Sequence, residues 1–350
     1  MNEDAGMTIE QTPIILPYKG TAPVFASPPT YMGPGSAVLG RATLGRSAWL
    51  GARSVIRADG HYVTIGDDFR LGGRGTVHIA HDVLPTHIGS HVTAGRRAVI
   101  HACDVGGDCF IGDDVVVLDG SKVAEACAIA AGSIVFPRSA LESGWLYEGA
   151  PAKRVRRLEA GELDALHHAA RSEPDEYEAA SPDSGSGPTQ DVFVAANVRL
   201  RGRIECEGEN GIWYGCELDA GDQAIKVGLH TNIQDNTVIR AVCGRVIIGA
   251  ESTIGHNVTM TDCEVGHASL IGIGSVVAPG TIVKDDVLVA AGARTTEGQI
   301  LESGWLYGGS PAKQIAPLDA KKRDMIAATW AQYCSYAAAF RKAQLRPSTP

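Results

Sequence analysis

Aliphatic residues recur at intervals of six positions over much of the chain. A period of six fits neither the 3.6-residue period of a helix nor the two-residue alternation of an amphipathic strand. It is typical of a β-solenoid, in which each hexapeptide forms one short strand and one turn, three hexapeptides complete a triangular coil, and the aliphatic side chains point inward. The two series are Val99, Val105, Ile111, Val117, Val123, Ile129 and Val135, then Val265, Ile271, Val277, Val283 and Val289.

A glycine often follows the aliphatic residue, as in Leu50-Gly51, Ile111-Gly112 and Ile271-Gly272. Glycine adopts positive φ values without steric cost. We therefore expect these glycines to form the tight corners of the coils.

The chain also repeats on a larger scale. The segment LESGWLYEGAPAK at positions 141–153 returns as LESGWLYGGSPAK at positions 301–313, a shift of 160 residues. The sequence therefore predicts a tandem duplication, with solenoids at about residues 23–155 and 192–315.

Helical patterns follow both predicted solenoids. Residues 158–171 form a short one, and residues 319–345 form a longer one that should fold back on the solenoid wall. Residues 172–190 are acidic and rich in Pro, Ser and Gly, as flexible linkers are. We expect an all-β solenoid fold with a first β-helix domain at 15–171, a linker at 172–190 and a second β-helix domain at 191–345. The second helix carries Ile326, Trp330, Tyr333, Tyr336 and Phe340 at helical spacing.

Composition narrows the class of partners. The chain has 350 residues, with 31 Lys and Arg against 40 Asp and Glu, which gives a net charge of −9. Neither nucleic acid nor a membrane surface is an expected partner of such a chain. The N-terminus lacks the basic and apolar parts of a signal peptide, and the eight cysteines form no CxxC pair, so we expect a cytoplasmic protein.

Finer motifs point to one family. The first half contains Leu16-Pro-Tyr-Lys-Gly-Thr-Ala-Pro23 and Val55-Ile-Arg-Ala-Asp59, and the second contains Ile212-Trp-Tyr-Gly-Cys216 and Asn232-Ile-Gln-Asp-Asn236. With the two Gly-Ala/Ser-Pro-Ala-Lys segments, these motifs resemble the γ-class carbonic anhydrase family over nearly the whole chain. The resemblance implies left-handed parallel β-helices, three-fold packing of prisms, and a metal site between neighbouring prisms.

In that family three histidines bind zinc, the first and third from one prism and the middle one from its neighbour. His78 and His101 match the first and third ligands, but Arg96 stands at the middle position. In the second half His256 matches the middle ligand, while Arg240 and a threonine replace the others. Because these losses are complementary, the resemblance implies one composite site between unlike domains. It would hold zinc, or another divalent metal such as iron or cobalt, with a hydroxide at the open position.

Four further residues match the family's catalytic motifs. Arg57 and Asp59 match an Arg-x-Asp motif that pairs across the interface, and Gln234 and Asp235 match a Gln-Asp motif that orients water. The resemblance therefore implies catalytic roles for these four. The loop after the first ligand has one acidic residue, Asp82, so no acidic proton shuttle is evident.

Other histidines and arginines have plainer interpretations. His81, His87 and His91 are expected to be solvated on solenoid turns. Arg96 and Arg240 cannot bind a cation because a guanidinium stays protonated. We expect them to form structural ion pairs with aspartates ahead of holding a substrate carboxylate.

The first functional hypothesis is a zinc-dependent lyase or hydrolase of γ-carbonic anhydrase type, in which a metal hydroxide attacks CO2 or another small electrophile. The alternatives are a CoA-dependent acyltransferase of the same solenoid class and a non-catalytic scaffold or assembly subunit. The expected partners are a small-molecule substrate and further copies of this chain, assembled on three-fold packing of the β-helices.

Overall fold

The computed structural model describes residues 12–175 and 191–344. The predicted all-β solenoid fold is confirmed: these described residues form about 15 turns of parallel, left-handed β-helix together with two helices. Most of the predicted linker, residues 176–190, lies outside the described residues.

Strands β1 to β20 form the first solenoid in two sheets. The larger sheet, which bends around two sides of the coil through the long strand β6, contains β1 (Ile14–Leu16), β2 (Val24–Phe25), β4 (Ala37–Leu44), β6 (Val55–Ile65), β8 (Thr76–His78), β9 (Thr86–Ile88), β11 (Val99–His101), β12 (Asp104–Val105), β14 (Val116–Val117), β15 (Lys122–Val123), β17 (Ile134–Val135) and β18 (Ala140–Leu141). The third side contains β3 (Tyr31–Met32), β5 (Trp49–Leu50), β7 (Arg70–Leu71), β10 (Thr93–Ala94), β13 (Phe110–Ile111), β16 (Ala128–Ile129), β19 (Trp145–Glu148) and β20 (Lys153–Arg157).

The second solenoid repeats this plan with strands β21 to β37. Its two-sided sheet contains β22 (Arg199–Cys206), β24 (Glu217–Val227), β26 (Val238–Arg240), β27 (Val246–Ile248), β29 (Thr259–Thr261), β30 (Glu264–Val265), β32 (Val276–Val277), β33 (Ile282–Val283) and β35 (Ile300–Leu301). Its third side contains β21 (Phe193–Val194), β23 (Gly211–Ile212), β25 (Asn232–Ile233), β28 (Thr253–Ile254), β31 (Leu270–Ile271), β34 (Leu288–Val289), β36 (Trp305–Gly308) and β37 (Lys313–Pro317).

The six-residue series corresponds to the side chains inside the coils, with one correction. Ile100, not Val99, pairs with Val117 and belongs to the interior of the first solenoid. Val99 faces outward and packs against Ile273 and Ala291 of the second solenoid. Val99 and Ile100 point to opposite faces of the strand, because successive strand residues alternate in direction.

The expected reason for the repeated glycines is also corrected. Gly51 has no positive φ; a Cβ atom there would lie 2.6 Å from the backbone nitrogen of Gly73 in the next coil. The left-handed conformation falls two positions later, on Arg53 with a φ of 57°. Glycine is therefore needed for the close approach of stacked coils.

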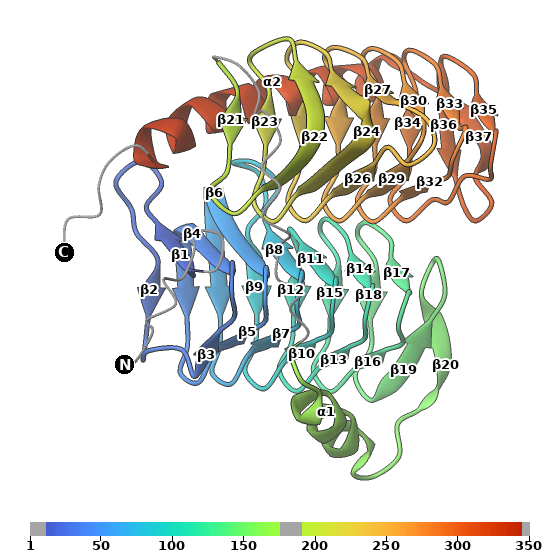
Figure 1. Cartoon of the computed structure of the whole chain (residues 1–350). Coiled ribbons are helices and arrows are strands. Elements are labelled where there is room, and N and C mark those ends of the chain that lie inside the picture. Colours follow the sequence, from blue (N-terminus) through green and yellow to red (C-terminus); the bar gives the residue numbers. More distant parts are fainter. Residues whose placement is uncertain (1–11, 176–190, 345–350) are drawn as a thin grey trace.

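The two solenoids lie side by side and advance in the same direction (Figure 1). Helix α1 (Glu162–Ser172) packs on the side of the first solenoid that faces away from the second (Figure 1). Helix α2 (Ala320–Gln344) packs on the third side of the second solenoid, and its Tyr336 also contacts Tyr18 of the first. Neither of these helices, the two in the described ranges, is long and apolar enough to cross a membrane.

A charged cluster also joins the two solenoids. The Glu217 carboxylate forms ion pairs with Arg53 and Arg74 of the first solenoid and with Arg199 of the second. Burial alone would raise the pKa of Glu217, but the three guanidinium groups outweigh burial and hold that pKa below its usual value.

Candidate metal centre

Three histidines converge where the solenoids meet. His78 ends β8 and His101 ends β11, and the two pair on adjacent coils of the first solenoid. His256 follows β28 at a corner of the second solenoid. One ring nitrogen from each histidine lies within 4.8 Å of the others. His78 and His256 are almost completely buried and His101 is 9 % exposed.

A carboxylate stands behind each imidazole. Asp59 Oδ1 lies 3.1 Å from His78 Nε2, Asp119 Oδ1 lies 2.6 Å from His101 Nδ1, and Asp235 Oδ2 lies 3.1 Å from His256 Nδ1. An anion facing one ring nitrogen fixes the proton on that nitrogen and leaves the lone pair on the other, the arrangement that metal-binding histidines show. The three lone pairs therefore point toward one another.

The spacing of these nitrogens fits a tetrahedral ion. His78 Nδ1 and His101 Nε2 are 3.3 Å apart. Two nitrogens about 2.0–2.1 Å from a tetrahedral zinc are separated by about 3.3 Å. Without a proton or a cation between them, two facing lone pairs at this distance repel. The donor set present therefore fits zinc.

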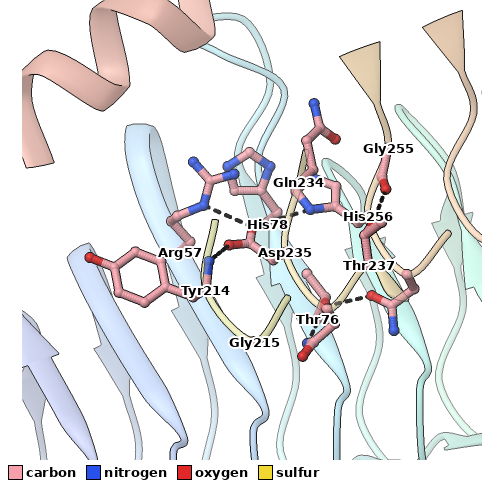
Figure 2. Close-up of polar contacts among 12 residues, drawn as sticks. Arg57, Thr76, His78, Tyr214, Gly215, Gln234, Asp235, Thr237, Gly255 and His256 are labelled. Carbon is pink, nitrogen blue, oxygen red and sulfur yellow. Dashed lines mark hydrogen bonds and ion pairs between the residues drawn. The ribbon is translucent and has the colours of Figure 1, made fainter. Parts of the chain in front are cut away.

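Arg57 joins the two halves of this centre. Its fully buried guanidinium pairs with Asp59 of its own solenoid. From Nε it donates to Asp235 Oδ2 of the other solenoid at 2.9 Å (Figure 2). It also donates to the Tyr333 hydroxyl of α2 at 2.9 Å and lies over the Trp213 ring at 4.3 Å. Arg57 thus orients the two carboxylates that orient His78 and His256.

The electrostatics of the centre favour a divalent cation. Burial and the nearby Arg57 charge hold the pKa of His78 well below its usual value, and burial lowers the pKa of His256 to about 4. These imidazoles are therefore neutral at pH 7. One guanidinium then stands against the carboxylates of Asp59, Asp119 and Asp235, an excess of two negative charges.

A cavity of about 460 Å³ opens beside the histidines. His78, His101, Gln234 and Tyr333 belong to its lining, whereas most of the remaining wall is aliphatic or aromatic. The solvent-side carboxylate is that of Asp119, whose side chain is 42 % exposed. The cavity connects the histidines with the outside.

The structure thus brings six of the seven predicted site residues into direct contact and places Gln234 at the cavity wall. Two residues of the centre were missed. Asp119 lies one 18-residue coil after His101 at the same corner, a spacing that identifies it in retrospect. The Tyr333 hydroxyl lies 3.4 Å from His256 Nε2; the helical pattern predicted its burial but not its place in the centre.

The expectations for the other arginines and histidines have different outcomes. Arg96 lies outside the centre and pairs with Asp113 at 3.0 Å, and Arg240 is exposed. His87 and His91 are exposed, but His81 is half-buried, lines the cavity and contacts the Tyr333 ring. The expectation that His81 is simply solvated was wrong because the loop folds back under α2.

Comparisons with known proteins agree with the motifs. The sequence is 35 % identical to gamma carbonic anhydrase 2, mitochondrial, of Arabidopsis thaliana over 136 residues, which are 37 % of this chain and 49 % of that protein. It is 34 % identical to protein YrdA of Escherichia coli K12 over 143 residues, 39 % of this chain and 78 % of YrdA. No protein-family model matches.

A solved structure from Desulfovibrio desulfuricans G20, provisionally named an acetyltransferase, matches 93 % of this chain and 81 % of its own with a TM-score of 0.60 at 16 % identity. At that identity the likeness concerns the fold alone. The chain spans about half to three fifths of the length of the first two Arabidopsis relatives.

Proposed function

The chain belongs to the γ-carbonic anhydrase-like family of hexapeptide-repeat proteins, and we propose that it holds a divalent metal ion, zinc first, and adds water to a small electrophilic carbon. His78, His101 and His256 would hold the ion. The proposal is carried by one observation, the convergence of three buried imidazole nitrogens with a carboxylate behind each.

When bound at three imidazoles, zinc lowers the pKa of water at its open position to about 7 and polarises a carbonyl oxygen. The chain's own residues would position protons and the substrate. Asp59, Asp119 and Asp235 hold the ring protons away from the centre, and Arg57 positions two of these carboxylates. The Gln234 side chain, at the cavity wall, orients water or a substrate oxygen. The Asp119 carboxylate lines the cavity with a side chain that is 42 % exposed, so it would pass a proton to solvent.

One chain supplies all three histidines, so no association between chains is required to complete the centre. CO2 is the default substrate by family, and assembly on three-fold packing stays a prediction. The native mass of the purified protein tests whether the chains assemble in this way.

The first test is the zinc content per chain by mass spectrometry, after purification without chelator. We expect about one zinc per chain, lost in His256→Ala and retained in His87→Ala, whose exposed imidazole lies outside the centre. Stopped-flow CO2 hydration and ester hydrolysis should follow zinc content. A metal-free wild-type protein that takes up no added zinc overturns the proposal, and acyl transfer that survives chelation favours the acyltransferase.

A further inference from the structure

The cavity beside the histidines is much larger than CO2 requires. Its volume is about 460 Å³. One water molecule accounts for roughly 30 Å³ of liquid, so a substrate of three heavy atoms would fill about a fifth of the cavity. A volume of this size holds an organic molecule.

The walls of the cavity are apolar and continuous. Leu270, Leu288 and Leu306 stand in register on three successive coils of the second solenoid, and Phe136 and Met325 line the cavity from the first solenoid and from α2. Neighbouring coils are about 4.8 Å apart, so the leucine ladder spans about 10 Å. Because carbon–carbon bonds of about 1.5 Å zigzag along an extended chain, each advances it by less than its own length, and about 10 Å matches roughly eight bonds.

The ladder begins beside the metal centre. Leu270 pairs with Thr253, which lies three positions before His256 on the adjacent coil. Successive leucines lead away from the histidines. A substrate whose reacting carbon lies at the centre would therefore place an attached apolar chain along the ladder.

We propose that the substrates of this site are carboxylic esters with an apolar acyl chain of about six to eight carbons, an inference that rests on the proposed function. In the reaction, the oxygen of one water molecule bonds to the acyl carbon and the bond from that carbon to the ester oxygen breaks. The leaving oxygen takes one proton of the water and the other passes to solvent. The products are a carboxylate and an alcohol, and nothing is oxidised or reduced.

The test uses the zinc-loaded full chain with p-nitrophenyl acetate, butyrate and hexanoate, and CO2 hydration alongside. Burial of a methylene strengthens binding about fourfold, so kcat/KM should rise at least tenfold from acetate to hexanoate even if half of the added chain is buried. Acetohydroxamate and hexanohydroxamate supply a readout without turnover. Hexanohydroxamate should bind at least tenfold more tightly in a calorimetric titration.

Three variants test whether the cavity wall determines the preference for longer acyl chains. Phe136→Ser removes a side chain that is 42 % exposed at the cavity wall, and Ile282→Ser is the matched control because Ile282 is 40 % exposed and lies outside the cavity lining. Thr329→Trp, on the α2 wall, should fill the cavity. Phe136→Ser and Thr329→Trp should lose the preference for hexanoate over acetate, whereas Ile282→Ser should keep it.

The outcomes distinguish failure of the ester proposal from failure of the proposed function. A zinc-loaded protein that turns over CO2 or acetate but shows no chain-length preference overturns the ester proposal and leaves the proposed function standing. A protein that binds no zinc and turns over none of the substrates overturns the proposed function itself.

Discussion

Replacing Arg57 by methionine should destabilise the contact between the solenoids. The guanidinium, Asp59 and Asp235 are all completely buried, so the variant leaves two carboxylates without their cation. Breaking a buried ion pair typically costs about 3–5 kcal/mol. The Asp235 carboxylate still accepts from the Tyr214 amide at 3.1 Å, and Asp59 keeps its contact with His78. We therefore expect the lower end, about 3 kcal/mol.

The assay is urea denaturation of the metal-free protein followed by tryptophan fluorescence, because Trp213 packs directly on Arg57. Arg46→Met is the control: Arg46 pairs with Asp67 at 3.8 Å on the surface and should contribute less than about 1 kcal/mol. Adding Asp235→Asn to Arg57→Met should recover at least about 1 kcal/mol, since one unpaired charge is removed. A loss below about 1 kcal/mol in Arg57→Met would refute the claim that this residue holds the two carboxylates.

Three further predictions concern other parts of the molecule. Asp119→Asn should weaken zinc binding about 10–100-fold in a competition titration, because it removes the anion behind His101, while the melting temperature changes little; unchanged affinity contradicts the role given to Asp119. Because the folded-state pKa of Glu217 is lowered, its contribution to stability is complete above its usual pKa of about 4.3 and is lost as pH falls through the folded value. Glu217→Gln should thus be less stable than wild type at pH 7 in urea titrations, with the difference shrinking below about pH 4.3, and a pH-independent difference argues against the ion pairs. Gly51→Ala should cost about 1–3 kcal/mol by forcing coils apart, whereas Gly73→Ala, where the nearest atom is 3.3 Å away, should cost less in the same thermal melts.

Sequence reasoning succeeded where a short-range rule determines the geometry. The six-residue period determines which side chains enter a coil, and the motifs around His78, His101 and His256 fix their corners, so the fold and the composite histidine cluster were both accessible. The same rule gave the wrong register at Val99, because the coil from Ile100 to Val117 has 17 residues whereas the next, from Val117 to Val135, has 18, so a strict period of six falls one residue too early.

The coil spacing would have identified Asp119, whereas the place of Tyr333 and the apolar cavity depend on longer-range packing. The place of Tyr333 depends on how α2 packs on the second solenoid, where the Tyr333 hydroxyl meets both Arg57 and His256, and helical spacing does not specify this packing. The apolar cavity arises where the first solenoid, the leucine ladder and α2 meet, and no single segment contains its pattern. Such features can be identified only once the folded structure is known.

Because the two solenoids share one chain, His256 is tethered to His78 and His101. Covalent linkage turns the meeting of two partners into an intramolecular event with an effective concentration that reaches about the millimolar range for short flexible linkers. A metal centre shared between separate subunits is lost when dilution separates them. In this protein the centre should persist at any concentration at which the chain stays folded, and its affinity for metal should be the same in nanomolar and micromolar solutions.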